Sequence, residues 1–398
     1  MKRKVKWGIK GQRNKIIAML LSIALAGTLL TGCGKETQTM EESLGETTEV
    51  FNIYMMSPSG VLRGDGQGYL HFYDRESGQT AYLCSQTGCL HQDANCGAYI
   101  NGLYCAFYYD DNLYYIRFTV DENDRAIYQL LRANRYGEER QQLAEFSPLP
   151  FPPDIKQYEG KLYFFGSDWD YEEDKAEGGL FTVDLESGEF MQIDHVEGYN
   201  IDYPLMSFSG QYYLTDRYLY RIYTSSNMDL NEFYDQETGA FLPINWDELV
   251  TTWLLYRTDR ETGESELLIE EVEDSDEFVM MDIIEADGEE MIVRLYNRII
   301  RYENGEEAEV LYEYTGEDIL WTITRLGDEY LVCENKPENR FHILRDWEEA
   351  DSFSALEEWC GCYGKAGNTI YFNTNSGLYA MDYEAFLNGS YELEHIDL

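Results

Sequence analysis

Short runs of apolar and aromatic residues, separated by polar turn residues, follow one another along most of the chain. Runs such as Leu113-Tyr114-Tyr115-Ile116 and Leu162-Tyr163-Phe164-Phe165 are too short for helices and show almost no helical period. Successive side chains of a strand point to opposite faces, so these runs predict strands that are buried on both faces. Antiparallel sheets usually leave one face in water, whereas the blades of a β-propeller bury both faces against their neighbours.

A turn signal recurs ahead of the aromatic strands and gives the chain a period. Its markers are Gly66, Asn112, Gly160, Gly210, Gly288, Gly327 and Gly367, at steps of 46, 48, 50, 78, 39 and 40 residues. Asn and Gly tolerate the positive φ that tight hairpins require. Repeats of about 40–50 residues built from short strands predict an all-β fold, a β-propeller. We expect seven blades, with six or eight as the alternatives. We attribute the long step to an insertion at about residues 225–248.

A second signal, Asp-x-Glu-Ser/Thr-Gly, is expected to follow the strands. It occurs four times, at residues 74–78, 184–188, 235–239 and 259–263. The aspartate can accept backbone N–H bonds where the turn begins, and the glycine can supply the left-handed residue where it ends. These segments therefore predict tight turns.

The first 33 residues have the pattern of an export signal. Seven Lys and Arg residues precede an uncharged, mostly apolar stretch from Ile16 to Leu30, which is short for a membrane span. The following Leu30-Thr31-Gly32-Cys33 resembles the lipobox of bacterial lipoproteins. The resemblance implies that residues 1–32 are a lipoprotein signal peptide and that Cys33 carries the lipid. The alternative is an ordinary signal peptide beside an unrelated cysteine.

The domain prediction follows from this N-terminus. Residues 33–49 are polar and acidic, so we expect the lipidated cysteine and a flexible tether there, followed by the propeller at residues 50–398. Two acyl chains hold a protein on a membrane well, whereas one holds it only marginally. We therefore expect a palmitate-type anchor on the extracytoplasmic face of the cell membrane.

The charge of the mature chain is strongly negative. Removing residues 1–32 leaves 23 basic and 75 acidic residues, a formal charge of −52. Such a surface repels the phosphates of nucleic acids and anionic lipids, so neither is an expected partner. We expect a monomer whose charge serves mainly to keep it in solution.

The strongest local chemical signal is a cluster of cysteines around one histidine. Cys84, Cys89, His91 and Cys96 form a C-x4-C-x-H-x4-C pattern after the first blade. Three thiolates and an imidazole suit a closed structural Zn²⁺ site. The same residues, with Cys105, could instead form disulfides in an oxidising compartment, or remain free thiols. The spacing matches no known zinc finger, so all three alternatives stay open. Cys333, Cys360 and Cys362 are expected to be structural.

Enzyme signatures are mostly missing from the sequence. The patterns G-x-S-x-G, H-E-x-x-H and G-x-x-x-x-G-K-[ST] do not occur. The acidic segment 168–174 alternates oxygen ligands but lacks the terminal glutamate of a calcium loop, so a solvated turn is the preferred interpretation. Carboxylates are too numerous for any pair to identify a catalytic site.

The lipobox, acidic tether and Tyr-rich repeats together resemble a largely uncharacterised group of Gram-positive surface lipoproteins with degenerate propeller domains. The most recognisable stretch is residues 83–99. The resemblance implies fold and location more than activity. We expect a non-enzymatic binding or interaction module for a glycan, a peptide or an envelope protein. The alternative is an extracytoplasmic polysaccharide hydrolase or lyase that uses carboxylates in the propeller funnel.

Overall fold

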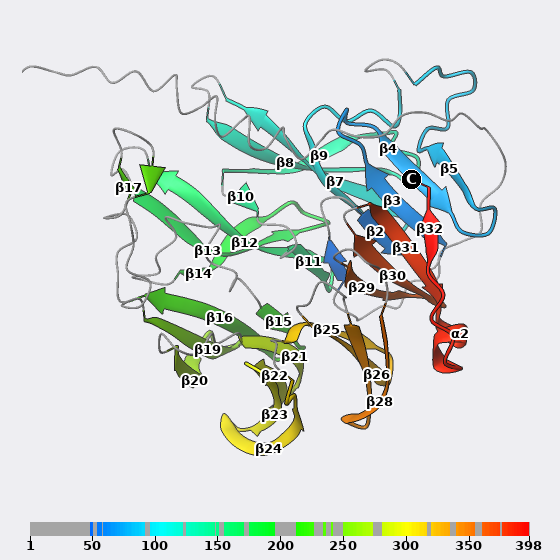
Figure 1. Ribbon diagram of the computed structural model, residues 1–398. Coiled ribbons are helices and arrows are strands. Elements are labelled where there is room, and N and C mark those ends of the chain that lie inside the picture. The colour runs from blue at the N-terminus through cyan, green and yellow to red at the C-terminus, as the bar shows by residue number, and fades with distance from the viewer. Residues whose placement is uncertain are drawn as a thin grey trace, which may run out of the picture.

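The protein is a seven-bladed β-propeller, and every blade is a small antiparallel sheet built from consecutive strands (Figure 1). The computed structural model describes residues 48–50, 54–57, 59–91, 96–121, 125–147, 149–150, 155–170, 175–195, 212–226, 234–235, 240–241, 250–273, 281–316, 320–334, 340–354, 360–374 and 376–397. Within these residues, no helix is long and apolar enough to cross a bilayer.

The first three blades take up the N-terminal half of the ring. Blade 1 contains β2 (Tyr54–Ser57), β3 (Gly60–Gly64), β4 (Leu70–Asp74) and β5 (Gln79–Tyr82). Blade 2 contains β6 (Leu103–Tyr109), β7 (Asn112–Val120), β8 (Ala126–Asn134) and β9 (Gln141–Phe146). Blade 3 contains β11 (Ile155–Tyr158), β12 (Lys161–Asp170), β13 (Lys175–Asp184) and β14 (Phe190–His195), with β10 (Leu149–Pro150) paired to β12.

The remaining four blades complete the ring. Blade 4 contains β15 (Tyr212–Leu214), β16 (Tyr218–Ser226), β19 (Thr251–Asp259) and β20 (Ser265–Glu273). Blade 5 contains β21 (Met281–Asp287), β22 (Glu290–Leu295), β23 (Arg298–Glu303) and β24 (Glu306–Glu313). Blade 6 contains β25 (Leu320–Leu326), β26 (Glu329–Glu334), β27 (Arg340–Arg345) and β28 (Glu348–Ser354). Blade 7 contains β29 (Cys360–Ala366), β30 (Thr369–Thr374), β31 (Gly377–Asp382) and β32 (Glu394–Ile396), with helix α2 (Tyr383–Leu387) before its last strand.

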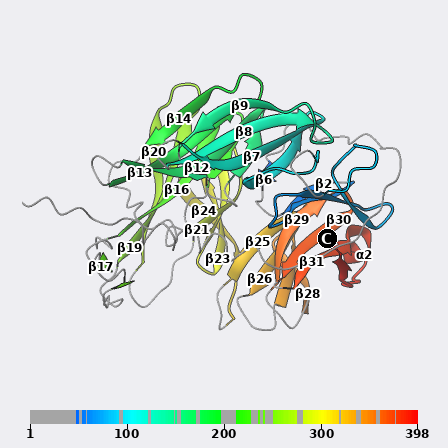
Figure 2. The same cartoon turned by 90° about the horizontal axis from the view of Figure 1, so that it is seen from above.

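The first strand of each blade lies nearest the middle of the ring (Figure 1), and neighbouring first strands such as β25 and β29 contact each other. The colours run around the ring from blue to red, so blades 1 and 7 lie side by side, and Figure 2 agrees from a perpendicular direction. Among the described strands, none from the N-terminal part joins the sheet of blade 7, and none from the C-terminal part joins the sheet of blade 1. Blades 1 and 7 are each built from consecutive strands.

Apolar clusters occupy all seven junctions between blades. The alternation along β12 shows how one strand serves two junctions: Leu162 and Phe164 pack into the cluster shared with blade 2, whereas Tyr163 and Phe165 pack against blade 4. The blade 7–blade 1 junction is closed by Val61 from β3 against side chains of blade 7. The remaining junctions are filled by similar clusters of blades 4 and 5, 5 and 6, and 6 and 7. The prediction that the middle strands are buried on both faces is therefore confirmed.

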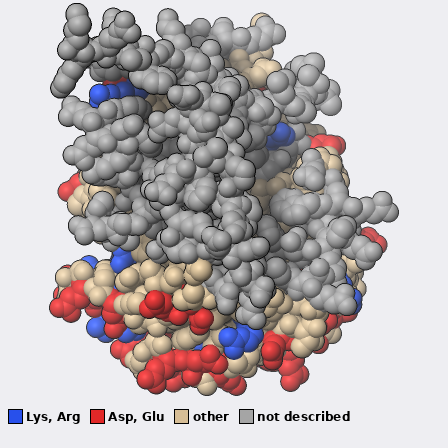
Figure 3. All heavy atoms as spheres, turned by 60° about the vertical axis from the view of Figure 1, so that its left-hand side comes forward, with Lys and Arg blue, Asp and Glu red and all other residues tan. Residues whose placement is uncertain are grey.

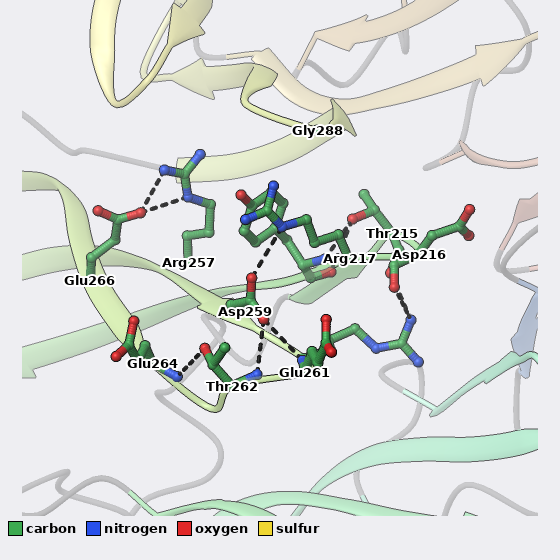
Figure 4. Close-up of polar contacts among 12 residues, drawn as sticks. Thr215, Asp216, Arg217, Arg257, Asp259, Glu261, Thr262, Glu264, Glu266 and Gly288 are labelled. Atoms are coloured by element: carbon green, nitrogen blue, oxygen red, sulfur yellow. Dashed lines mark hydrogen bonds and ion pairs between the residues drawn. The ribbon is translucent and has the colours of Figure 1, made fainter.

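Three of the four Asp-x-Glu-Ser/Thr-Gly turns, at residues 74–78, 184–188 and 259–263, have the predicted structure. The fourth runs from Asp235 into residues 236–239, which lie outside the described part of the chain. Asp259 accepts backbone N–H bonds from Glu261 and Thr262 (Figure 4), and Asp184 does the same with Glu186 and Ser187. Glycines 78, 188 and 263 have φ values of 64°, 75° and 74°, the left-handed conformation expected of them.

The long step in the repeat is an insertion within blade 4. Residues 227–250 separate β16 from β19, and a two-stranded hairpin of β17 (Tyr234–Asp235) and β18 (Ala240–Phe241) lies inside them. The markers of the first turn signal stand ahead of strands, as expected, but not all of them at the same place in a blade. Gly66 stands between the second and third strands of blade 1, and Gly210, outside the described residues, precedes the first strand of blade 4.

Tyrosine suits the blade junctions because its ring is apolar and its hydroxyl can bond a neighbouring backbone. Tyr212 of blade 4 donates to the Tyr163 carbonyl of blade 3 at 2.8 Å, and Tyr383 of α2 donates to the Leu326 carbonyl of blade 6 at 2.6 Å. Tyr330 of blade 6 donates to the Glu285 carboxylate of blade 5 at 2.7 Å. Much of the high tyrosine content therefore serves blade packing.

Alkaline pH is predicted to destabilise the propeller. Burial raises the pKa of Tyr302 and Tyr312 to about 12, and burial also raises the pKa of Tyr115, Tyr128 and Tyr330. Tyrosines of the unfolded chain ionise near pH 10, so the unfolded state releases protons first. The free energy of unfolding is therefore fully retained below about pH 10 and falls as the pH rises towards and beyond about 12.

Urea unfolding at a series of pH values, with tyrosinate absorbance followed in parallel, measures this effect. Folded protein should ionise most of its tyrosines only together with unfolding. Free titration of nearly all tyrosines near pH 10, with no loss of stability, would contradict the assignment of these phenols to the junctions.

Candidate metal centre

The connection between β5 and β6 carries the cysteine and histidine cluster and is tied to blade 1 by backbone bonds. The Leu83 N–H donates to the Leu70 carbonyl, and the Leu70 N–H donates to the Ala98 carbonyl, both at 2.9 Å. The Ile100 N–H donates to the Gly68 carbonyl at 2.7 Å, and Tyr69 and Tyr99 form an isolated antiparallel bridge. The connection thus folds back onto the turn between β3 and β4.

All four predicted ligands come together in this connection. One potential ligand atom from each of Cys84, Cys89, His91 and Cys96 lies within 4.8 Å of the other three. Cys96 is 2% exposed, whereas the other three are half-buried. The four donors are three soft thiolates and one imidazole. This donor set suits a tetrahedral Zn²⁺ ion.

Backbone N–H groups point at the sulfur atoms of the cluster. Burial would raise the pKa of the Cys84 thiol, but N–H bonds from Gln86 and Gly97, helped by the neighbouring thiols, hold that pKa below its ordinary value. The Ala98 N–H donates to the Cys96 sulfur at 3.4 Å, although burial dominates there and raises the pKa of Cys96 to about 12.

Aromatic rings support the histidine. Tyr82, the last residue of β5, stacks on His91 with ring centroids 4.3 Å apart and an interplanar angle of 17°. His91 Nδ1 lies 3.2 Å from the Cys96 sulfur. Tyr82 also contacts His71, whose Nε2 lies 3.0 Å from the Asp65 carboxylate. Burial, with the nearby His71, lowers the pKa of His91, which favours the neutral imidazole that binds metals.

The same connection is bound to blade 2. Arg140, just before β9, donates from its guanidinium to the Gly97 carbonyl at 2.6 Å and to the Tyr99 carbonyl at 2.8 Å. Ser85 donates to the Glu138 carboxylate at 2.7 Å. Gly137 approaches so closely that an added Cβ would lie 2.6 Å from the Gly97 oxygen, so a side chain cannot be accommodated there.

The other predicted cysteines lie elsewhere. Cys105 is buried on β6 in the core of blades 1–3, and Cys333 and Cys362 lie in the core between blades 6 and 7. None of the six cysteines with described side chains forms a disulfide in this structure. Cys33 lies outside the described residues, and of Cys360 only the backbone, in β29, is described. In the acidic segment 168–174, Asp168–Asp170 end β12 and residues 171–174 lie outside the described part.

Two polar arrangements were not predicted from the sequence. Arg140 lies more than 40 residues in sequence from the carbonyls it binds, and no local sequence pattern predicts such a contact. At the blade 5–blade 6 junction, Glu334 accepts a bond from Tyr314 at 2.7 Å and lies 2.6 Å from His342 Nε2. Glu334 and His342 are each 4% exposed. The available signal was weak, because His342 lies within the apolar stretch of β27 but Glu334 is only the last residue of β26. We interpret this pair as structural, because Glu334 and His342 contact each other inside the core and His342 Nδ1 lies 3.0 Å from the Glu349 carboxylate.

Comparison with known proteins gives likeness of fold only. No protein-family model matches the sequence, and no curated protein matches it. An acylaminoacyl peptidase, in a complex with Z-Gly-Gly-Phe-chloromethyl ketone, is 14% identical over 74% of this chain and 45% of its own, with a TM-score of 0.44. The β-propeller domain of the trilobed protease from Pyrococcus furiosus is 15% identical, over 74% of this chain and 82% of its own, with a TM-score of 0.44. This chain therefore spans less than half of the peptidase.

The substitution Arg140→Ala tests how firmly the connection is held to blade 2. It removes charge-assisted bonds to two carbonyls, and we expect the free energy of unfolding to fall by about 1–2 kcal/mol. Urea unfolding measures the change. Arg301→Ala is a matched control, because Arg301 makes an exposed ion pair with Glu309 and its loss should cost at most about 0.5 kcal/mol. Equal effects of the two substitutions would contradict the assigned role of Arg140.

Proposed function

We propose that this chain is a lipid-anchored binding module that presents one end of its propeller to the medium outside the membrane. The anchor is the lipid on Cys33, and the ligand is a glycan, a peptide or another envelope protein. The observation that carries the proposal is the direction in which the N-terminal segment joins the ring.

That segment, β1 (Thr48–Val50), pairs antiparallel with β11, the innermost strand of blade 3. Thr48 lies opposite Gln157, close to the Glu159–Gly160 turn, and Val50 lies opposite Ile155 at the other end of the strand. The chain therefore reaches the ring from the end that carries the turns between first and second strands. We call this the turn end and the opposite end the loop end. The pairing begins two residues before the expected domain boundary at residue 50.

The two ends differ in the length of their connections. At the turn end, six of the seven first turns have two residues between the strands and that of blade 4 has three, and the longest connection between a third and a fourth strand, from β31 to β32, has 11. At the loop end, the insertion between β16 and β19 has 24 residues, and 16 residues separate β14 from β15. Long connections on a rigid scaffold are the usual carriers of binding residues, whereas two-residue turns offer little reach.

At the turn end, the arginines of blade 4 are paired within the protein. In blade 4, Arg217 pairs with Asp259 at 3.1 Å and Arg257 pairs with Glu266 (Figure 4). Arg260 donates to the Thr215 carbonyl at 2.7 Å and reaches Tyr163 and Glu159 of blade 3 at 3.2 and 3.3 Å. These three arginines of blade 4 are therefore engaged within the protein, which favours the loop end as the binding surface.

The negative charge of the propeller favours a position in which the tether holds the domain away from the bilayer. Acidic atoms outnumber basic ones over the described lower edge of the molecule (Figure 3), at the height of β24 in Figure 1. Such a surface is repelled by anionic lipids and nucleic acids, so membrane attachment depends on the acyl chains. Fifteen residues from Cys33 to Thr48 span at most about 50 Å, which allows the turn end to face the membrane without touching it.

Lipid labelling and energy transfer test the anchor and the orientation together. Radiolabelled palmitate should enter the full chain but not the Cys33→Ala variant. For orientation, an azide-bearing amino acid is placed at Glu186, in a turn-end hairpin, or at exposed Val120, at the loop end of β7, and coupled to a donor dye. With acceptor lipids in the membrane, transfer should be stronger from residue 186 than from residue 120.

Equal labelling of Cys33→Ala would refute the anchor, and stronger transfer from residue 120 would refute the orientation. The ligand class is then sought with glycan and peptide arrays, and each bound compound is examined for products. Turnover of a bound polysaccharide would replace the binding module with the hydrolase or lyase alternative.

A further inference from the structure

We propose that Cys84, Cys89, His91 and Cys96 bind one Zn²⁺ ion in a closed tetrahedral site that fastens blade 1 to blade 2. This proposal is independent of the anchor and of the ligand at the loop end. It rests on the geometry of the cluster, on the atoms around it and on the two blades that its connection joins.

The donor atoms need only a small movement to bind the ion. In a tetrahedral site with Zn–S distances of about 2.3 Å and Zn–N distances of about 2.0 Å, neighbouring donors lie about 3.5–3.8 Å apart. The four donors lie within 4.8 Å of one another, and His91 Nδ1 and the Cys96 sulfur are already 3.2 Å apart. A contraction of about 1 Å or less therefore completes the site. With four protein ligands no position is left for substrate, so the role is structural.

A disulfide explains this cluster less well. The cluster contains three thiols, so a bridge between two of them would leave the third unpaired beside an imidazole. Cys105, the fourth cysteine of this region, is buried in the core of blades 1–3 and does not belong to the group of close donors. A metal ion, by contrast, uses all three thiols and the histidine at once.

The surroundings of the cluster are those of bound thiolates. Backbone N–H groups of Gln86 and Gly97 bond to the Cys84 sulfur, and that of Ala98 bonds to the Cys96 sulfur. Tyr82 stacks on the imidazole of His91 and holds its orientation. Such outer contacts orient ligands and stabilise the charge that thiolates bring to a metal.

The ion would join two blades. The connection is bonded to the β3–β4 turn of blade 1 and, through Gly97 and Tyr99, to Arg140 of blade 2. Blade 1 has strands of only four or five residues, whereas those of blade 2 have six to nine. Blade 1 therefore contributes the shorter side of this junction, and a metal-ordered connection adds contacts where the sheet supplies few.

The metal content of the full-length protein, purified in detergent without chelators or a metal-binding tag, tests the site. Mass spectrometry should find about one Zn²⁺ per chain, and X-ray absorption should show three sulfur ligands and one nitrogen ligand at about 2.3 and 2.0 Å. The Cys84→Ser/Cys96→Ser double variant should lose the zinc. Cys333→Ala and His395→Gln, which change a cysteine and a histidine far from the cluster in sequence, should keep it.

Several results would overturn the site without any need for a variant to fold. One is wild-type protein that contains no zinc and whose denatured mass is two hydrogens below that of the reduced chain. Another is a bound zinc ion whose ligands are oxygen and nitrogen atoms alone. Retention of zinc by a folded double variant would do the same.

Hydrogen exchange tests the fastening. Removal of zinc should speed exchange both in residues 83–102 and in the β8–β9 turn at residues 135–140, and leave the distant β23–β24 turn of blade 5 unchanged. Unchanged exchange at residues 135–140 would show that the ion orders the connection without joining the blades, contrary to the proposal.

Discussion

The structure depends on apolar contact between the faces of neighbouring sheets. A four-stranded sheet of this size cannot bury both of its own faces, and each blade here has two apolar faces because alternate residues of its middle strands point opposite ways. On β30, Ile370 and Phe372 pack toward blade 6 while Tyr371 packs toward blade 1. Only a closed ring gives every blade two neighbours. Because no described strand is exchanged between the first and last blades, this closure depends on side chains such as Val61, Leu378 and Ile396.

Two features of the composition follow from this constraint. Tyrosine is abundant because a blade junction needs a large apolar ring, while the adjacent turns offer carbonyls and carboxylates to its hydroxyl. Acidic residues collect on outer strands; β24, for example, exposes Glu306, Glu307 and Glu309. An outer strand has unpaired backbone groups on one edge, and charged side chains there prevent pairing with another molecule.

Much of the fold could be predicted because its determinants are local. Two-faced apolar strands and Asp-initiated turns leave a signature within a few residues, and the insertion in blade 4 lengthens one step of the repeat. Composition alone misleads at the acidic run 270–277: it has the composition of a solvated linker, but residues 270–273 belong to β20, since an outer strand can carry charged side chains. The pairing of β1 with β11 left no signature either, because it joins segments more than 100 residues apart through backbone bonds that any sequence can make.

The candidate site likewise has a part that the sequence predicts and a part that it does not. The four residues of the cysteine and histidine cluster are close in sequence, so their pattern could be recognised there, whereas the contacts of Arg140 and of the His342–Glu334 pair depend on how blades meet.

Native-state hydrogen exchange tests the closed ring most directly. If the blade 7–blade 1 junction closes the ring, amides of β3 and β30 should open with the same free energy as those of β16 in blade 4, within about 1 kcal/mol. Opening of β3 and β30 at several kcal/mol less than β16 would show an open array with weak ends and contradict the account.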